Sequence, residues 1–343
     1  MKVLFDITHP AHVHLFRHAI GELIEQGHEV LVTSREKDLT IDLLDSYEMD
    51  HVNLSKKRNG EFGTVIEWTK REIKLLLVAR SFDPDVMVSR FNPAMGHVST
   101  LLGCPCLFFD DTENKPFLLR KCGYPFADRI YTPDSFKIST GANQVSYPSY
   151  HELAYLHPNR FTPDPSIKED AGLDEDERFV ILRLVSWDAA HDVNDSGFKD
   201  AVDVVSELES TGVTVLITSE DDLPQEIEHC QISVGPHRTH HLMYYADLFI
   251  GESATMASES AVLGTPAVFV SSSRRGYTDE LEKKYGLVFN YSEDNRHQHG
   301  IDKAIDILTM NSDSEWETRR RHLLEDKIDA TEYILNKIKE KAM

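Results

Sequence analysis

The chain has 343 residues, of which 58 are acidic and 36 are basic, so its formal net charge is −22. A negative charge of this size repels a phosphate backbone over most of the surface and argues against a nucleic-acid partner. The length suffices for two domains, and the sequence has neither an apolar run of about 18 residues nor a charged-then-apolar leader, which predicts a cytoplasmic protein.

Strands and helices are expected to alternate along the chain. The expected strands cover 2–7, 28–33, 86–89, 106–109, 129–132, 179–184, 214–218, 246–250 and 267–270. The expected helices cover 14–26, 38–47, 94–102, 197–210 and 241–246, with a basic helix inside 56–80 and charged helices over 314–341. This alternation predicts an α/β fold with a doubly wound parallel sheet in each half.

Prolines mark the boundary between the two halves. Pro148, Pro158, Pro163 and Pro165 fall in a stretch without a long apolar period, which indicates a linker. The predicted division is an N-terminal Rossmann-like domain over 1–150, a linker over 151–168, a C-terminal Rossmann-like domain over 169–313 and terminal helices over 314–343 that pack back across the cleft.

The first strand is followed by a loop that holds three histidines, His9, His12 and His14. An imidazole, with a pKa near 6.5, can take a proton from a sugar hydroxyl that attacks an anomeric carbon. Capping and hydrogen bonding are the structural alternative. Zinc binding is the third, but alternate spacing on an irregular loop is a weak metal signal, so no metal is expected.

The basic segment 56–80 is the only net-positive stretch of the chain, with seven basic residues against three acidic ones. Ile66, Ile73 and Leu77 recur in it at helical spacing, which predicts a basic amphipathic helix. Such a helix either packs on the core or contacts an anionic acceptor or a membrane surface.

Four polar residues, Asp110, Asp111, Glu113 and Asn114, follow the expected strand 106–109. Ligands of doubly wound sheets bind at the carboxyl ends of the strands, so these side chains are expected in the cleft. Carboxylates there could orient acceptor hydroxyls or hold Mg²⁺, and a plain solvated turn fits as well.

The first strand of the second half ends in a similar way. Arg183 lies at its end, and Ser186 follows in the next loop. A guanidinium is suited to bidentate phosphate binding, and a hydroxyl can add a contact to a diphosphate.

The most informative segment is 251–266, between two expected strands. It begins with small and hydroxyl residues, including Ser253, Ala254 and Thr255, and then carries Glu259 inside an apolar helical pattern. Such a loop exposes the N–H groups of a helix N-terminus, which suit a phosphate. Glu259 would lie about two turns, roughly 9 Å, into the helix, where a nucleotide ribose would fall. The pattern favours a nucleotide-sugar site, and an ordinary capped helix with a solvated glutamate remains the alternative.

The four cysteines, Cys104, Cys106, Cys122 and Cys230, are too few and too scattered for a disulfide framework. Cys104 and Cys106 lack the second pair that a zinc site needs. We therefore expect reduced thiols.

Segment 251–266 resembles the donor-site signature of GT-B glycosyltransferases, above all the MurG type, through Ser258, Glu259, Ala261, Gly264 and Pro266. UDP-N-acetylglucosamine 2-epimerases carry a related signature. Further matching segments identify the chain as similar to a largely archaeal family catalogued as domain of unknown function 354, which is related to the GT-B superfamily. These segments are 6–16, 109–114, 151–164 and 183–192.

The resemblance implies a GT-B-like fold with two Rossmann-like domains facing a central cleft, and it assigns roles to residues. Glu259 would hold the ribose of UDP, and His12 would be the catalytic base. The loop of His237 would frame the nucleobase, while Arg183, Ser186 and 253–255 would bind the diphosphate. The glycines that flank the histidine in MurG-type enzymes are replaced here by Pro10 and Ala11.

The function implied by the resemblance is that of an inverting, metal-independent glycosyltransferase without a cofactor. It would transfer a sugar from a UDP-sugar to a glycan or a polyprenyl-phosphate-linked acceptor, with peripheral contact to the inner face of the membrane through 56–80. One alternative is a 2-epimerase in which Asp110, Asp111 and Glu113 shuttle protons, although 183–192 replaces the His-Arg-Arg-Glu-Asn run of those enzymes. Another is a non-catalytic nucleotide-sugar-binding protein.

Overall fold

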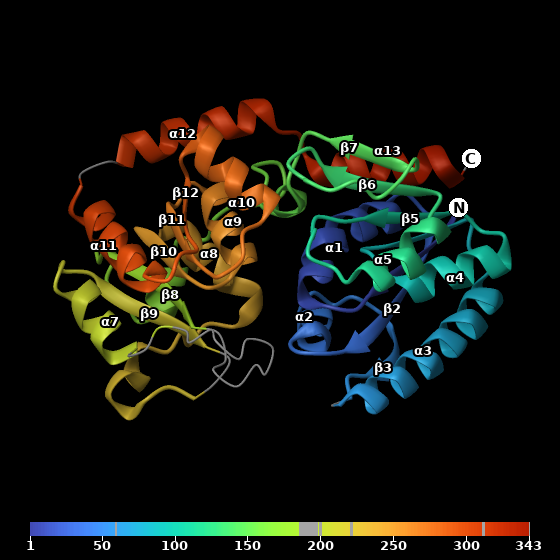
Figure 1. Cartoon of the computed structure of the whole chain (residues 1–343), viewed down its shortest axis with the longest axis horizontal. Coiled ribbons are helices and arrows are strands. Elements are labelled where there is room, and N and C mark those ends of the chain that lie inside the picture. Colours follow the sequence, from blue (N-terminus) through green and yellow to red (C-terminus); the bar gives the residue numbers. More distant parts are fainter. Residues whose placement is uncertain (59, 185–197, 199–200, 220–221, 311–312, 343) are drawn as a thin grey trace. The chain divides into compact units, whose positions relative to one another are not determined.

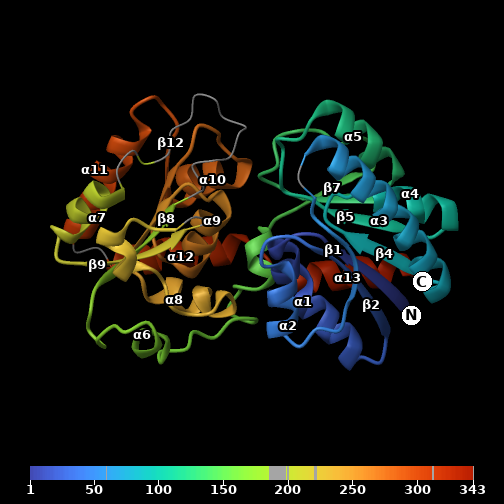
Figure 2. The ribbon, with the colours of Figure 1, turned by 90° about the horizontal axis from the view of Figure 1, so that it is seen from below.

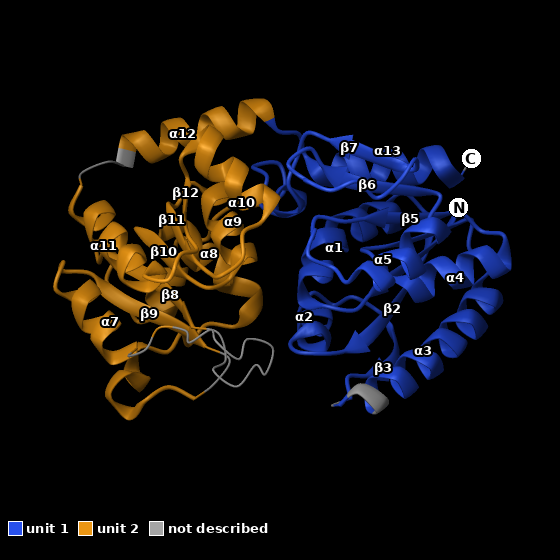
Figure 3. Ribbon diagram, viewed as in Figure 1, with its two compact units in different colours: residues 1–160, 327–343 blue, residues 161–326 orange. Residues whose placement is uncertain are grey.

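The computed structural model of the chain describes residues 1–58, 60–184, 198, 201–219, 222–310 and 313–342. These residues form two compact units (Figure 3). Unit 1 comprises 1–160 and 327–343, and unit 2 comprises 161–326. The second boundary separates the two terminal helices, so that α12 (Asp313–Asp326) belongs to unit 2 and α13 (Ala330–Ala342) belongs to unit 1.

Unit 1 is built on a parallel sheet in the order β3-β2-β1-β4-β5-β6-β7. Its strands are β1 (Lys2–Ile7), β2 (Glu29–Glu36), β3 (Val52–Lys56), β4 (Val86–Ser89), β5 (Cys106–Phe109), β6 (Arg129–Pro133) and β7 (Gln144–Tyr147). The order reverses between β1 and β4, so the crevice that such sheets use for ligands opens at the carboxyl ends of these two strands.

The helices of unit 1 cover both faces of this sheet, as Figure 2 shows. They are α1 (Pro10–Glu25), α2 (Thr40–Ser46), α3 (Glu61–Phe82), α4 (Pro93–Leu102), α5 (Phe117–Gly123) and α13, with short 3₁₀ turns η1 (Tyr124–Phe126) and η2 (His151–Ala154). Helices α1, α2 and α13 lie on one face, and α3, α4 and α5 lie on the other. The central strands are therefore buried on both faces, which explains why their sequences are continuous runs of apolar residues.

Unit 2 has a smaller parallel sheet in the order β12-β11-β10-β8-β9 (Figure 1). Its strands are β8 (Phe179–Leu184), β9 (Thr214–Ser219), β10 (Leu248–Gly251), β11 (Ala267–Val270) and β12 (Val288–Tyr291). Its α-helices besides α12 are α6 (Ile167–Asp170), α7 (Ala201–Glu209), α8 (Thr239–Tyr245), α9 (Ala254–Leu263), α10 (Gly276–Glu280) and α11 (Arg296–Thr309). Three short helical turns complete it, η3 (Gln225–Cys230), η4 (Pro236–Arg238) and the π-helical η5 (Leu281–Tyr285). The strand order reverses between β8 and β10, beside the segment 251–266.

Several elements differ from the sequence-based expectation. Helix α1 begins at Pro10 rather than at residue 14, because His9 caps it with its side chain and Pro10 occupies the first turn, where a missing N–H costs nothing. Strands β3, β7 and β12 were not expected, since they are short and their residues are only partly buried. The expected linker 151–168 divides at Arg160, and its first part packs into unit 1.

Arg160 shows why this segment belongs to unit 1. Its Nε donates to Asp329 just before α13 at 2.7 Å, and it also pairs with Glu22 of α1.

Among the described residues, no helix has the length and apolar character that a membrane span requires.

Candidate functional site

The loops that follow β1, β4 and β5 bring a polar cluster together at the carboxyl edge of the unit 1 sheet. Thr8, His9 and His12 follow β1, Arg90 follows β4, and Asp110 and Asp111 follow β5. Parallel strands place these loops at one edge, so residues that are about 100 positions apart in the chain become neighbours. The sequence-based placement of these loops rests on the same rule.

His9, which caps α1, and His12, in the first turn of α1, are each held in a defined tautomer. The Nδ1 atom of His12 accepts a hydrogen bond from the backbone N–H of Thr8 at 3.3 Å, and Nδ1 of His9 accepts from the N–H of Ala11 at 3.2 Å. A backbone N–H can only donate, so the neutral rings carry their proton on Nε2. Each ring therefore offers the site an N–H donor.

The electrostatic surroundings keep both rings neutral. Burial, followed by the nearby cations Lys37 and Arg90, lowers the pKa of His9 to about 4. Burial is also the largest cause of the lowered pKa of His12, and Arg90 adds to it. In this geometry His12 has no free lone pair, so the role of base that the family resemblance implies for it is not supported.

His14 lies apart from this cluster. Its ring is buried and stacks on Tyr155 with 5.1 Å between the ring centroids. It packs in the core of unit 1, because it falls on the inner face of α1 with Val13 and Leu15. The expectation that His14 lies in the loop after the first strand is therefore wrong, because the residue belongs to α1.

The two aspartates after β5 are both buried and both paired. Asp110 accepts from Lys115 Nζ at 2.7 Å and from the hydroxyl of Tyr124 at 2.7 Å. Asp111 pairs with Arg90 and accepts from the hydroxyl of Thr112 at 2.9 Å. These contacts occupy carboxylates that the sequence had suggested as free acids or bases.

The other two residues of that loop are less enclosed. Glu113 is half-buried and accepts a hydrogen bond from the backbone N–H of Lys137 at 3.3 Å. Asn114 is exposed. The structure thus brings Asp110 and Asp111, but not Asn114, into the buried cluster.

His151 is a member of the cluster that sequence reasoning missed. It is 4% exposed, and its Nδ1 lies 3.0 Å from a carboxylate oxygen of Asp111. Burial lowers the pKa of His151 well below its usual value, so the ring is neutral at pH 7, and neither ring nitrogen has a hydrogen-bond partner among the described residues. In the tautomer that carries its proton on Nδ1, the nitrogen that lies 3.0 Å from Asp111, the ring has a lone pair on Nε2. The sequence placed this residue in the linker, because only tertiary packing brings η2 near Asp111, which follows β5.

In unit 2, helix α9 begins directly after β10. The hydroxyl of Ser253 accepts from the backbone N–H of Met256 at 3.3 Å, which caps the helix. Ala254 and Thr255 form the partly exposed first turn, where N–H groups lack partners within the helix. This end of the helix carries the positive pole of the helix dipole.

Glu259 lies in the second turn of α9 and is 5% exposed. Its carboxylate is 3.0 Å from Nε2 of His240 in α8, so the glutamate is not solvated as the structural alternative required. His240 is also buried and was not singled out from the sequence. The signal that could have identified it is its place in the histidine-rich run 237–241.

The remaining predicted donor residues are placed as follows. Arg183 is the penultimate residue of β8, and its guanidinium donates at 3.0 Å to the hydroxyl of Thr218, the penultimate residue of β9. Gly251 is necessary beside it, because a Cβ there would lie 2.6 Å from Cβ of Arg183. His237 is half-buried in η4. Ser186 lies outside the described residues.

Within the described part of the chain, one group of three side chains, Glu209, His229 and Cys230, has metal-ligand geometry. Their ligand atoms lie within 4.8 Å of one another, and Glu209 and His229 are exposed. None of the predicted site residues belongs to this group.

Helix α3 places its faces differently from the sequence-based expectation. Glu67, Arg71, Leu75 and Ala79 point inward. Ile66, Ile73 and Leu77 are exposed, the last two by 56% and 63%. The apolar spacing read from the sequence therefore marks the outer face of a helix whose inner face carries an acid and a base.

The family described as "Protein of unknown function (DUF354)" matches residues 1–340 of the chain. An uncharacterized protein of Methanocaldococcus jannaschii is 24% identical over 321 residues, which cover 86% of this chain and 92% of that protein.

Solved structures of the GT-B type are similar over almost the whole chain. The UDP-GlcNAc 2-epimerase of Neisseria meningitidis, bound to UDP-GlcNAc, has a TM-score of 0.70 at 13% identity and covers 99% of this chain and 100% of its own. A glycosyltransferase of Streptomyces sp. SF2575, complexed with thymidine diphosphate, has a TM-score of 0.65 at 12% identity, with 99% of both chains covered. These likenesses confirm the predicted fold of two parallel-sheet α/β domains of the GT-B type.

Proposed function

This chain belongs to the DUF354 family, and we propose that it is a GT-B-type glycosyltransferase that takes a sugar from a UDP-sugar donor. The observation that carries the proposal is the arrangement around α9. A capped helix N-terminus follows β10 at the carboxyl edge of the sheet, and the buried pair of Glu259 and His240 lies one to two turns behind it. Glycosyltransferases and epimerases with bound nucleotides that share this fold support a nucleotide site.

In the proposed donor site, the amides of 253–255 and Arg183 bind the diphosphate and Glu259 binds the ribose hydroxyls. His240 would hold the Glu259 carboxylate in place, and His237 would border the base. A helix N-terminus and a guanidinium together can neutralise the leaving diphosphate, so the proposed transfer needs no metal ion. Direct attack by the acceptor hydroxyl would invert the anomeric carbon.

Unit 1 is the proposed acceptor unit. Two of its histidines would have different roles, one as a hydrogen-bond donor and one as the general base. His12 would donate its Nε2–H to an oxygen of the acceptor. The neutral His151, whose Nδ1 lies 3.0 Å from a carboxylate oxygen of Asp111, would act as the general base in the tautomer that has its proton on Nδ1 and a lone pair on Nε2. Because Nε2 of His151 is covered in the structure, we expect the proton of the attacking hydroxyl to reach it through a bound water.

The outer face of α3 supports an acceptor held at a membrane. Ile66, Ile73 and Leu77 are exposed there beside Lys70 and Arg80. Exposed apolar and basic residues on one helix face are typical of helices that lie on anionic lipid. The proposed acceptor is therefore a glycan linked to a polyprenyl phosphate, reached by peripheral contact.

The test is incubation with UDP-, GDP- and dTDP-sugars, with and without a polyprenyl-phosphate acceptor, while release of the nucleoside diphosphate is measured. Release of UDP that rises with the acceptor supports the transferase. Binding of every nucleotide-sugar without turnover contradicts it and supports a non-catalytic binding protein.

A 2-epimerase is the second candidate, because the TM-score of 0.70 with the Neisseria enzyme exceeds that of 0.65 with the Streptomyces transferase. In that reaction the proton shuttles would come from Asp110, Asp111 and Glu113. Both aspartates are engaged by cations, which is unfavourable for proton transfer. An altered sugar that is still attached to UDP, seen by NMR in the same incubation, would establish the epimerase.

A further inference from the structure

Three side chains of different chemistry converge in unit 2, outside the residues assigned to the proposed reaction. They are Glu209 at the end of α7, and His229 and Cys230 at the end of η3. Their ligand atoms, a carboxylate oxygen, an imidazole nitrogen and the thiol sulfur, all lie within 4.8 Å of one another. Carboxylate, imidazole and thiolate are the side-chain groups that bind Zn²⁺ in proteins.

The main chain holds these residues together. Helix α7 contacts both β9 and η3, and Figure 1 shows α7 beside β9. Leu208, just before Glu209, and Cys230 are both buried in the core of unit 2. Gln231, just after Cys230, forms a parallel bridge with Ile217 of β9. Core packing and backbone pairing therefore fix the two segments from which the three ligands project.

The distance between the imidazole and the thiol matches a tetrahedral zinc site. Nε2 of His229 lies 3.5 Å from Sγ of Cys230. With Zn–N and Zn–S bonds of about 2.1 and about 2.3 Å, a tetrahedral angle between them places the two ligand atoms about 3.6 Å apart. The observed spacing is therefore the spacing that one Zn²⁺ requires. The Glu209 side chain is exposed, and its oxygen needs to move by only about 1 Å to join them.

The surroundings of the thiol suit a bound cation better than a reactive thiolate. Burial and the negative charge of Glu209 both raise the pKa of Cys230. A nucleophilic or redox-active cysteine needs a lowered pKa, so these neighbours disfavour such chemistry. A dication among the same three groups would reverse the effect, because it stabilises the thiolate and is itself stabilised by the carboxylate.

The ligand set also selects the metal. Mg²⁺ and Ca²⁺ bind through oxygen ligands, and Glu209 is the single oxygen donor of this group. A thiolate together with an imidazole suits Zn²⁺. Three protein ligands leave one tetrahedral position, which a water molecule can fill.

We propose that Glu209, His229 and Cys230 bind one Zn²⁺, with a water molecule as the fourth ligand. On binding, the Cys230 thiol forms a sulfur–zinc bond and releases its proton to the solvent, while the neutral imidazole and the carboxylate each supply a lone pair. The ion joins the end of α7 to η3 and so braces the start of the segment that leads to α8. The inference is independent of the proposed transfer, because none of the three ligands takes part in it.

Substitution with cobalt tests the thiolate ligand. The chain has 17 histidines, so binding of Zn²⁺ does not by itself identify this site. Titration of the reduced, untagged full chain with Co²⁺ should produce the thiolate-to-cobalt charge-transfer band in the near ultraviolet and the visible bands of tetrahedral Co²⁺, both complete at one equivalent. Zn²⁺ should remove both sets of bands by competition. A Co²⁺ complex without a thiolate band would overturn the site.

Variants test which residues are the ligands. Loss of an outer-shell partner commonly costs about 10–100-fold in metal affinity, so loss of a ligand should weaken Zn²⁺ binding by at least about 100-fold. His229→Gln and Cys230→Ser should both show this loss in competition with a chromophoric chelator, and Cys230→Ser should abolish the thiolate band. Cys122→Ser, at an exposed cysteine, and Glu226→Gln, at an exposed acid of η3, are the matched controls.

A stability measurement protects the test against a folding defect. Cys230 is buried, so Cys230→Ser can destabilise the core, whereas His229 is exposed and His229→Gln leaves the core unchanged. Zn²⁺ should raise the urea midpoint of the unaltered protein and of Cys122→Ser but not that of His229→Gln, because an ion that binds the folded state stabilises it. Equal shifts in all three proteins, or loss of the thiolate band in Cys122→Ser, would overturn the proposal.

Discussion

The carboxyl edges of the two sheets are built on opposite principles. In unit 1 the edge holds buried ion pairs, Asp6 with Arg71 and Asp111 with Arg90. In unit 2 the corresponding edge offers small residues, backbone N–H groups and one buried pair, Glu259 with His240. A buried charge pair holds its two side chains in place, but removing one partner leaves an unpaired buried charge that destabilises the fold. Backbone N–H groups at a helix N-terminus bind an anion without a charged side chain. Changes in unit 1 should therefore affect chemistry and folding, and changes in unit 2 should affect ligand affinity.

The largest effect is expected for the histidines of unit 1. His151→Gln should lower turnover by about 10² to 10⁴-fold, the usual contribution of a general base. His12→Gln should keep much more activity than His12→Ala, because the glutamine amide replaces the Nε2–H donor. Steady-state kinetics with UDP-sugar and acceptor measure both. An inactive His12→Gln beside an active His151→Gln would restore His12 as the base.

The next effect concerns folding of the unit 1 edge. Asp6→Ala should destabilise the protein by about 3–5 kcal/mol, because it leaves the buried guanidinium of Arg71 without its carboxylate. Urea unfolding followed by circular dichroism measures this loss, and Asp50→Ala, at an exposed aspartate, is the control. A loss below about 1 kcal/mol, the range of exposed pairs, would show that the pair is not buried in solution.

The free energy of unfolding should depend on pH through His9, at the carboxyl edge of the unit 1 sheet. His9 has its pKa lowered to about 4 and is neutral in the fold, while the unfolded chain binds a proton near 6.5. Its contribution is thus complete above about pH 6.5 and is lost as the pH falls toward 4, by roughly 3 kcal/mol at most. His9→Gln should flatten the acid limb of the unfolding free energy between these values. An unchanged slope would show that the His9 ring is hydrated and titrates normally.

Glu259 tests the edge of unit 2. Glu259→Gln should weaken UDP binding by about 1–3 kcal/mol, since it removes hydrogen bonds to a charged group while preserving a partner for His240. Calorimetry with UDP measures the change, and Glu226→Gln, at an exposed glutamate of the same unit, is the control. Unchanged affinity in a folded Glu259→Gln protein would remove the donor-site assignment.

The effect that is smallest for each residue changed is expected at the outer face of α3. Changing Lys70, Lys74 and Arg80 together to glutamine should weaken binding to anionic vesicles by about 1 kcal/mol per residue, and high salt should have the same effect. Co-sedimentation measures it. Binding that ignores both the triple change and the salt would argue against the membrane acceptor.

The sequence by itself determined the buried strands and the loops that follow them. Strands β4, β5, β8 and β11 have the bounds that their apolar runs predict, because parallel strands buried on both faces are continuously apolar. The positions of Glu259 and His12 in helices that follow a strand of the sheet come from the same alternation. These features depend only on residues that are close together in the chain, so they can be recognised from one sequence.

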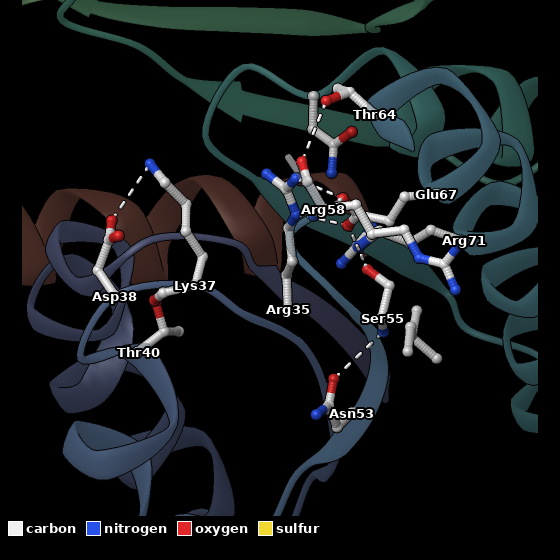
Figure 4. Close-up of polar contacts among 12 residues, drawn as sticks. Arg35, Lys37, Asp38, Thr40, Asn53, Ser55, Arg58, Thr64, Glu67 and Arg71 are labelled. Atoms are coloured by element: carbon white, nitrogen blue, oxygen red, sulfur yellow. Dashed lines mark hydrogen bonds and ion pairs between the residues drawn. The ribbon is translucent and has the colours of Figure 1, made fainter. Parts of the chain in front are cut away.

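Tertiary structure alone decided what these residues contact. His151 reaches Asp111 from a segment that the prolines marked as a linker, and His240 reaches Glu259 from a neighbouring helix. The orientation of α3 is the clearest case. Its apolar spacing predicted one inner face, yet Glu67 and Arg71 point inward, because Arg35 (Figure 4) and Asp6 from distant strands pair with them there. A buried charge requires a partner, and which partner the fold supplies depends on which strands are neighbours rather than on local spacing.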